Sequence, residues 1–408
     1  MSASQAAVQH ARSKSEPPFD RARASALMEE QGVDLIVACS RANVGYLADY
    51  TYYVAQGLPY VLEDGRQWSI TFVGVPRDSK LEPFITPVSS EHGSISYADP
   101  WIGERRFWGP KWTYAGQASP TAAGAPGDVA SCVADAITER GLASGRVAIE
   151  LEGTPAPRYL RLRELLPKAE FVDAARILDA LRIVKTPTEI ARLREVARVT
   201  DLAIRAGYEA LSETPTELQV QSAMARVFVE HGMSFGWCSV AYGPKGVTLI
   251  EPTELHPTVG EIVRIDVVGI HHGYYSDMSR VNSFRRRPND DCSRAHAAIL
   301  ETNSVMRRET GPGVRVADLA RIAHETLGSH GYPMLAPQAG HGIGRDVHEP
   351  PYLADWDPTV LRPGMVLDLE PAMRVAGVGS VNIEDMVLVT DSGCEVLTQF
   401  PRELETFG

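Results

Sequence analysis

Four acidic residues interrupt apolar stretches in the second half of this 408-residue chain, and they constrain its fold more than any other feature. They are Asp266 in VRIDVV, Asp277 in the segment that returns after HHGYY, Glu370 in VLDLEPAM and Glu384 in VNIEDMVLV. Apolar runs of this kind predict buried strands. A buried carboxylate is unfavourable unless it is paired, hydrogen-bonded or bound to a metal ion, so the fold has to supply positive partners for these acids.

Two predicted strand pairs carry the four acids. The segments EIVRIDVVGI and SDMSRVNSF, joined by a Gly-containing turn, predict a β-hairpin that brings Asp277 back beside Asp266. GMVLDLEPAMRV and GSVNIEDMVLVT predict a second strand pair with Glu370 and Glu384. Acids gathered in this way repel one another unless a cation lies among them, and oxygen-rich ligand sets suit Mn, Co or Zn.

A histidine completes the candidate ligand set. His341 lies in AGHGIGRDVHEPPY, where neighbouring glycines allow the backbone to approach a crowded centre closely. Any one of these residues by itself is more typical of a satisfied core side chain than of a ligand. An unpaired cluster of buried charge is so unfavourable, however, that the set as a whole predicts a divalent-metal site. The predicted ligands are Asp266, Asp277, His341, Glu370 and Glu384.

Two other motifs in the same region carry weaker signals. GHGIG looks like a phosphate-binding loop, but it lacks the lysine and the strand–loop–helix context of a P-loop. His348 and Glu349 begin like a zinc-binding HExxH helix, but Pro350 and Pro351 exclude a helix that would carry the second histidine. Neither motif changes the predicted ligand set.

The length of the chain exceeds what one hydrophobic core usually serves, which predicts two domains. Residues 1–18 are largely polar and end in two prolines, so we expect a flexible tail. Strand and helix patterns alternate over residues 19–182, which predicts an α/β domain with a sheet flanked by helices. A Thr-Pro-Thr-Glu segment then gives the N-terminal signature of a long helix, and we place the second domain at residues 183–408.

Composition excludes several classes of protein. A net charge of −12, with no basic run longer than Arg285–Arg287, argues against a nucleic-acid partner. Five scattered cysteines without CxxC spacing argue against a disulfide framework or a structural zinc site and are typical of the reducing cytoplasm. The N-terminus lacks an apolar signal segment, and no apolar run approaches the about 18 residues of a membrane span. We therefore expect a soluble cytoplasmic protein without a membrane partner.

Aromatic residues are dense in one segment of the first domain, between residues 98 and 118. Such a segment is typical either of a lid or substrate wall or of a packing anchor against a neighbouring domain or subunit. The residues are Trp101, Phe107, Trp108, Trp112 and Tyr114.

The motifs of the second domain together resemble one family. IDVVGIHHGYYSDMSR, GHGIGRDVHEPPY, LEPAM and NIEDMVLVT are similar to segments of the pita-bread metallopeptidases of family M24, which include aminopeptidase P, prolidase and creatinase-like proteins. The linker LRIVKTPTEIARLREVA and the size of the first domain also resemble this family, so the resemblance covers nearly the whole chain from Phe19. It implies an α+β chain, with an N-terminal creatinase-like α/β domain followed by a pita-bread catalytic domain.

The resemblance also implies a mechanism with two divalent ions (Mn, Co or Zn). Asp266 would bind one ion through both oxygens, and His341 and Glu370 would hold the other, while Asp277 and Glu384 would bridge the two. A metal-activated water would attack, Glu370 would relay its proton, and His348 would contact the substrate near the scissile bond. The resemblance further implies a homodimer.

Three positions depart from the peptidase pattern. Leu249 and Pro337 stand where the family has histidines, and Asn382 stands where it commonly has the arginine of RIED. Overall similarity favours hydrolysis of an amide or other C–N bond in a small peptide, as by Xaa-Pro dipeptidases and aminopeptidases. The departures favour a small non-peptide substrate, with a hydrolase or lyase similar to ectoine hydrolase or dimethylsulfoniopropionate lyase. A non-catalytic binding protein on the same fold is a third and more remote alternative.

Overall fold

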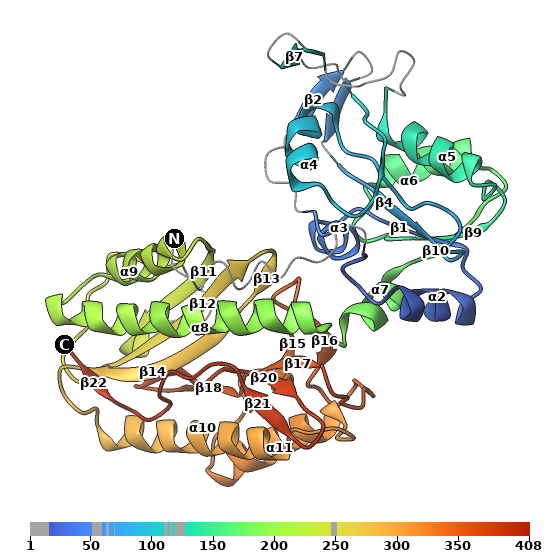
Figure 1. Cartoon of the computed structure of the whole chain (residues 1–408). Coiled ribbons are helices and arrows are strands. Elements are labelled where there is room, and N and C mark those ends of the chain that lie inside the picture. Colours follow the sequence, from blue (N-terminus) through green and yellow to red (C-terminus); the bar gives the residue numbers. More distant parts are fainter. Residues whose placement is uncertain are drawn as a thin grey trace. The chain divides into compact units, whose positions relative to one another are not determined.

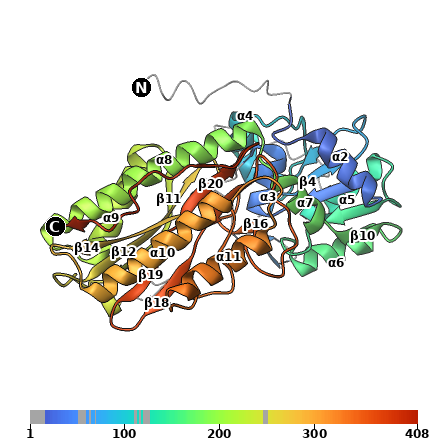
Figure 2. The same cartoon turned by 90° about the horizontal axis from the view of Figure 1, so that it is seen from below.

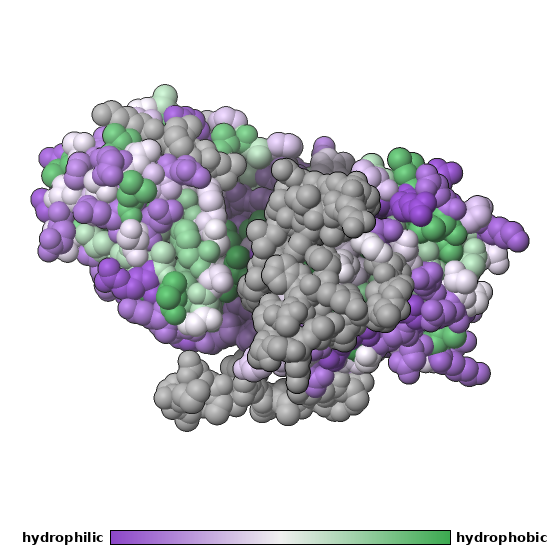
Figure 3. All heavy atoms as spheres, turned by 90° about the horizontal axis from the view of Figure 1, so that it is seen from above, coloured by the Kyte–Doolittle hydropathy of each residue, from purple (hydrophilic) through white to green (hydrophobic). Residues whose placement is uncertain are grey.

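The computed structural model describes residues 16–50, 59–62, 65–68, 70–109, 113–114, 117–118, 127–245 and 251–408. The chain divides into two compact units, Met1–Leu181 and Arg182–Gly408 (Figure 1). On the coloured surface that Figure 3 shows, hydrophobic side chains lie among hydrophilic ones. Among the helices of the described residues, none has both the length and the apolar content needed to cross a bilayer.

The first unit is built on a mixed six-stranded sheet. Its strands, in spatial order, are β10 (Glu170–Asp173), β9 (Arg146–Ile149), β1 (Leu35–Ala38), β4 (Val73–Pro76), β5 (Phe84–Ile85) and β6 (Glu104–Arg105). The β10–β9, β9–β1 and β5–β6 pairs are parallel, and the β1–β4 and β4–β5 pairs are antiparallel. Smaller elements complete the unit: η1 (Ser89–Glu91), α4 (His92–Ala98), and the hairpins β2 (Pro59–Leu62) with β3 (Gly65–Trp68) and β7 (Thr113–Tyr114) with β8 (Gln117–Ala118).

Helices cover both faces of this sheet (Figure 1). Because side chains alternate along a strand, Ile36 and Ala38 of β1 pack in one core cluster, while Leu35 and Val37 pack in another. The first cluster is closed by α2 (Arg21–Glu30), α3 (Arg41–Ala48) and α7 (Ala175–Arg182), and the second by α5 (Val129–Glu139) and α6 (Ala156–Leu165). The predicted sheet flanked by helices is confirmed.

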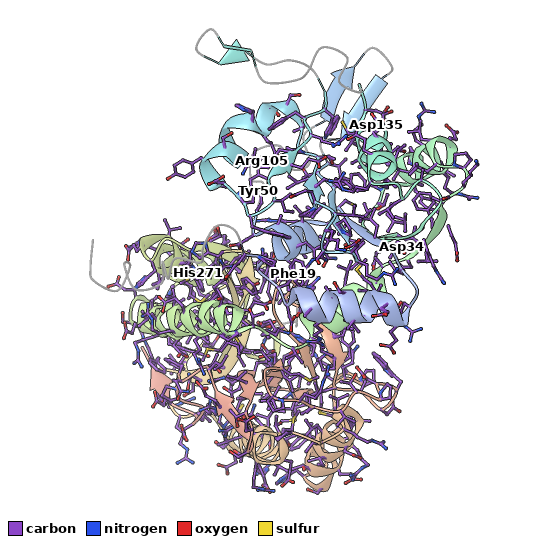
Figure 4. All side chains as sticks on the ribbon, turned by 45° about the vertical axis from the view of Figure 1, so that its right-hand side comes forward. Phe19, Asp34, Tyr50, Arg105, Asp135 and His271 are labelled. Atoms are coloured by element: carbon purple, nitrogen blue, oxygen red, sulfur yellow. The ribbon has the colours of Figure 1, made fainter. Side chains whose placement is uncertain are left out.

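The described part of the aromatic segment packs into the core of the first unit. The indole N–H groups of Trp101 and Trp108 donate to main-chain carbonyl groups of the same unit, at 2.8 and 3.1 Å. Phe19, which Figure 4 labels, lies with its ring centroid 6.1 Å from that of Trp101. Trp112 and the side chain of Tyr114 lie outside the described residues. The described aromatic residues are therefore core anchors of the first unit.

The first half of the second unit places two helices on a sheet that is antiparallel except for the parallel β14–β22 pair. The helices are α8 (Pro187–Glu209), extended by η2 (Ala210–Glu213), and α9 (Glu217–Glu230). The strands are β11 (Ser234–Tyr242), β12 (Ile262–His271), β14 (Met278–Phe284) and β22 (Thr406–Phe407), with β13 (Tyr274–Tyr275) beside β12 and η3 (Gly243–Lys245) after β11. A capping box between Thr186 and Glu189 begins α8. Val199 and Met224 then pack with Ile265 of β12 in one core cluster.

The second half repeats this arrangement with α10 (Asp290–Glu309) and α11 (Val316–Ser329). Its sheet runs β16 (Glu349–Tyr352), β15 (Gly340–Gly342), β17 (Val366–Leu369), β20 (Asp385–Val389) and β21 (Cys394–Val396), and β18 (Ala372–Val375) pairs with β19 (Gly379–Asn382). Leu367 and Leu369 pack with Met306 of α10 and Leu319 of α11. Figure 2 shows α10 and α11 across these strands, and Figure 1 shows the strands between the two helix pairs. The predicted succession of an α/β unit and an α+β unit is confirmed.

Candidate metal centre

Three acidic side chains meet in the interior of the second unit. Asp266 lies in the middle of β12, Asp277 directly precedes β14 and Glu384 directly precedes β20. All three are at most 7% exposed, and one carboxylate oxygen from each lies within 4.8 Å of the others. The predicted strand pairs therefore bring together acids that are more than 100 residues apart in the chain.

A second group adjoins the first. His341 on β15 places its Nε2 atom 3.6 Å from Oε2 of Glu370, which directly follows β17. Asp368 of β17 lies opposite His341 in the strand register, and its carboxylate joins the group, with ligand atoms of the three residues within 4.8 Å of one another. Asp368 was not among the predicted site residues, although it interrupts the same apolar strand as Glu370 and the same criterion applies to it.

His348 lies at the edge of these groups. Its ring centroid is 4.2 Å from that of His341, and it can join Asp277 and His341 in a third group of ligand atoms within 4.8 Å. Partial burial lowers the pKa of His348, although Asp266 opposes that change. Unlike His341, His348 is exposed at the surface of the unit. It therefore has access both to solvent and to the acids.

Several buried atoms in this cluster have no hydrogen-bond partner. They are Oδ1 of Asp266, Nε2 of His341 and both carboxylate oxygens of Asp368. A buried polar atom without a partner usually costs about 1–3 kcal/mol. Nδ1 of His341 lies 3.0 Å from the carbonyl oxygen of Gly342 and donates to it, which leaves the Nε2 lone pair free. Carboxylates with an imidazole nitrogen are a ligand set for Mn, Co or Zn, so the residues present fit divalent ions.

The electrostatics of the cluster point the same way. Burial, and then the neighbouring acids, raise the pKa values of Asp277, Glu384 and Asp368 well above their ordinary range. Burial, and then Asp266, raise the pKa of Glu370 to about 7. Burial also lowers the pKa of His341 to about 3, so its imidazole is neutral, as a ligand has to be. Divalent cations would relieve the repulsion among these acids.

Arg264 is the cation that the protein itself places beside the acids. It is fully buried on β12, two residues before Asp266 and thus on the same face of the strand. Nη1 donates to Oδ2 of Asp266 at 3.0 Å, and Nη2 donates to Oγ of Ser239 at 2.7 Å. Sequence reasoning missed this residue. The sequence does carry a signal for Arg264, because it is a second charged residue, two positions before Asp266, in an otherwise apolar strand.

The three departures from the peptidase pattern lie in different places. Asn382 is buried, and its Nδ2 donates to Oε1 of Glu384 while its Oδ1 accepts from Oγ of Ser279 at 3.0 Å. It therefore touches a predicted ligand. Pro337 lies in an exposed bend before β15. Leu249 lies outside the described residues.

The backbone around His341 is as crowded as its glycines predicted. Gly340 has φ +147°, and a Cβ atom there would lie 2.1 Å from the carbonyl oxygen of Asp368. A Cβ atom at Gly342 would lie 2.4 Å from the carbonyl oxygen of Pro350. No larger residue fits at either position without moving the backbone, so the glycines allow β15 to lie close to its neighbours.

A buried ion network braces the strand that follows His348. Glu349 accepts from Nζ of Lys185 at 2.8 Å and from Arg182, and all three side chains are at most 7% exposed. Burial alone would raise the pKa of Glu349, but Arg182 and Lys185 lower it to about 2. A carboxylate held by two cations keeps the neighbouring His348 backbone in place.

Two parts of the chain match known families. Residues 191–391 match metallopeptidase family M24, and residues 110–184 match the creatinase/prolidase N-terminal domain. The first match contains all the acids and histidines described above.

Individual relatives agree with these matches. The putative dipeptidase YkvY of Bacillus subtilis is 31% identical over 278 residues, which are 66% of this chain and 75% of that protein. The Xaa-Pro dipeptidase of Pyrococcus horikoshii is 30% identical over 216 residues, which are 50% of this chain and 60% of that protein. The structure of an Xaa-Pro dipeptidase from Bacillus anthracis superposes with a TM-score of 0.77 at 23% identity, covers 95% of this chain and 99% of its own, and shows the shared fold.

Proposed function

Because the chain belongs to metallopeptidase family M24 and is a metal-dependent hydrolase, we propose that it hydrolyses a C–N bond in a small peptide with two divalent ions. One observation carries the proposal. Predicted ligand atoms from two separate strand pairs converge within one small volume, and two of them, Oδ1 of Asp266 and Nε2 of His341, are buried without a partner. A divalent ion, which accepts lone pairs, would satisfy both atoms.

The proposed ligand set has two parts that share their bridging residues. Asp266, Asp277 and Glu384 would hold one ion, and this group matches one observed cluster of ligand atoms. His341 and Glu370 would hold the second ion, with Asp277 and Glu384 between the two. Since Arg264 already occupies one lone pair of Oδ2 of Asp266, we propose Oδ1 as the principal ligand atom of this residue.

The remaining groups would handle protons and charge. When bound, the metal ions supply Lewis acidity, which activates water near neutral pH and polarises the scissile carbonyl group. Glu370, the most exposed of the acids, is placed to accept the proton of the attacking water and pass it to the leaving amine. His348, at the edge of the cluster, is placed to donate a hydrogen bond to the developing oxyanion.

For the substrate, we propose a peptide of the Xaa-Pro class. The support is the similarity over 278 and 216 residues to a putative dipeptidase and an Xaa-Pro dipeptidase. A second candidate is a small non-peptide substrate, handled by a hydrolase or a lyase on the same ions. Asn382 favours it, because a neutral amide replaces the family's arginine on Glu384 and so changes the charge beside the ligands. We also propose a homodimer in the cytoplasm, where five free cysteines would stay reduced.

Metal analysis of the purified protein tests the proposed centre. We expect two divalent ions per chain, loss of activity after chelation, and recovery with Mn or Co. A protein that binds no divalent ion and gains no activity from Mn or Co would refute the proposal and favour a non-catalytic binding protein. The identity of the ion that restores the highest activity then indicates the working metal.

A substrate panel separates the two substrate classes. Gly-Pro and Xaa-Pro-Xaa peptides are assayed beside small cyclic amides and betaines, with the same metal-loaded protein. Turnover of the peptides, with kcat/KM higher than for any non-peptide, is the expected result. Turnover restricted to the non-peptide compounds would exclude the prolidase-like assignment but leave the metal centre intact.

A further inference from the structure

Asp368 is an acid at the centre of the second unit that the five-residue ligand set leaves without a role. It is 0% exposed, and neither of its carboxylate oxygens has a hydrogen-bond partner. A buried carboxylate in this condition is among the least favourable groups a protein can hold. The carboxylate of Asp368 therefore needs a partner that the described protein groups do not supply.

The strand register aims this carboxylate at the centre. Asp368 lies directly opposite His341 in the antiparallel β15–β17 pair and two residues before Glu370, so the three side chains share one face. Their ligand atoms lie within 4.8 Å of one another. Ligand atoms at about 2.0–2.2 Å from one ion lie about 3–4.4 Å apart, so one ion can contact all three after small movements.

Two buried arginines of the neighbouring sheet of this unit hydrogen-bond to other groups. Arg264 of β12 donates to Asp266 and Ser239. Arg280 of β14 donates to Asp385 and to main-chain carbonyl groups, among them that of Glu384. Neither guanidinium hydrogen-bonds to Asp368, which leaves the acid available to a metal ion.

We propose that Asp368 is a further ligand of the ion held by His341 and Glu370, an inference that rests on the two-metal function proposed above. The charge of the centre then balances, because two divalent ions and the Arg264 guanidinium together match five carboxylates. The second ion gains an additional oxygen ligand. Oxygen-rich sets suit Mn better than nitrogen- or sulfur-rich sets do, so Asp368 shifts the preference of the site toward Mn relative to Zn.

The test compares Asp368→Asn with the wild-type full chain. After EDTA treatment, Mn(II) and Zn(II) titrations by calorimetry give the affinity of each ion, and elemental analysis gives the number bound. We expect the variant to bind one of two Mn ions at least about tenfold more weakly, with a smaller loss for Zn. The metal-free variant should unfold at the same temperature as the wild type or a higher one, because a buried acid without a hydrogen-bond partner has been removed.

Glu217→Gln is the matched control. Glu217 is also a buried carboxylate, but it accepts hydrogen bonds from Thr253 and lies on α9, away from the acid cluster. This variant should unfold at a lower temperature and keep wild-type metal affinity. If Asp368→Asn behaves in the same way, Asp368 is a structural residue and the inference is wrong.

The outcomes also separate the inference from the proposed function. Two Mn ions bound to the wild type and to Asp368→Asn with equal affinity would overturn the role of Asp368 and leave the proposed centre standing. A wild type that binds no Mn would overturn the proposed centre itself. A selective loss of one ion in Asp368→Asn supports both.

Discussion

The two acid-bearing strand pairs of the second unit differ in the residue that lies two positions before the first predicted metal ligand of each pair. In the β12–β14 pair this residue is Arg264, which donates to Asp266. In the β17–β20 pair it is Asp368, a second acid beside Glu370 whose own carboxylate oxygens have no hydrogen-bond partner. Both residues are at most 1% exposed, and both share a face with the acid that follows.

The difference separates two ways of holding acids inside a sheet. The first pair offsets part of its negative charge with a guanidinium group from its own strand. The second pair has no guanidinium group on Asp368, and the neighbouring His341 on β15 is neutral at physiological pH, so the proposed metal ions would offset its charge. Metal removal should therefore disturb the second pair more than the first, and substitutions in each pair measure the difference.

The two acids proposed to bridge the ions give the largest expected effect, because each comes from a different pair. Asp277→Asn and Glu384→Gln should each lower kcat/KM by more than about 100-fold, the upper end of what a lost supporting partner costs, and should abolish binding of at least one ion. Steady-state kinetics and elemental analysis check both results. Activity retained in either variant would contradict the bridging role of that residue and show that one pair suffices.

Arg264→Met tests the cation of the first pair. Asp266 would lose its partner, and we expect metal affinity and kcat/KM to fall by about 10–100-fold. Arg264→Lys keeps the charge and should recover part of the loss. A double-mutant cycle that combines Arg264→Met with Asp368→Asn measures whether the two positions are coupled. Simple additivity in that cycle would disprove electrostatic coupling between the two positions.

Asn382→Leu tests the neutral neighbour of Glu384 in the second pair. Leu has a similar volume but cannot donate to Oε1 of Glu384, so Glu384 would be less well oriented. We expect a decrease in kcat/KM of about tenfold and little change in unfolding temperature, because Ser279 keeps its bond to the Ile265 carbonyl group. An unchanged kcat/KM would mean that the ions alone orient Glu384.

Much of the fold could be predicted because burial and periodicity are local signals. The alternating pattern of residues 19–182 predicted the first sheet, the apolar run around β12 predicted that strand, and the capping residues before α8 predicted the start of that helix. The second acid-bearing strand pair was less completely predicted. It divides into β17 with β20 and β18 with β19, because the chain leaves one sheet near Glu370 and rejoins it near Glu384.

The candidate site shows the same division. The structure brings together the side chains of Asp266, Asp277, His341, Glu370 and Glu384, and their role as ligands stays a prediction. Arg264 and Asp368 also interrupt apolar strands, but Arg264 acts on Asp266 and Ser239, and Asp368 lies opposite His341 on another strand. Their importance depends on which strands are neighbours in space, and single-strand patterns do not contain that information.

The smallest expected effect concerns two histidines that are at least partly buried, one in each half of the second unit. Burial lowers the pKa of His296 on α10 to about 4, and that of His271 at the end of β12 also to about 4. Between pH 6.5 and pH 4 these two histidines therefore bind more protons in the unfolded chain than in the folded chain, so their contribution to stability falls as the pH falls. From pH 6.5 to pH 5.5 His296 alone should lower the free energy of unfolding by about 1 kcal/mol.

His296→Gln should remove the contribution of this histidine to the pH dependence of stability, as measured by urea unfolding of the metal-free protein at several pH values. His330→Gln, at an exposed position at the end of α11, is measured beside it for comparison. If only His296→Gln changes the slope, the helix layer over the second strand pair is what acid weakens. An unchanged slope in both variants would place the effect elsewhere, with His271→Gln in the first half as the next variant to measure.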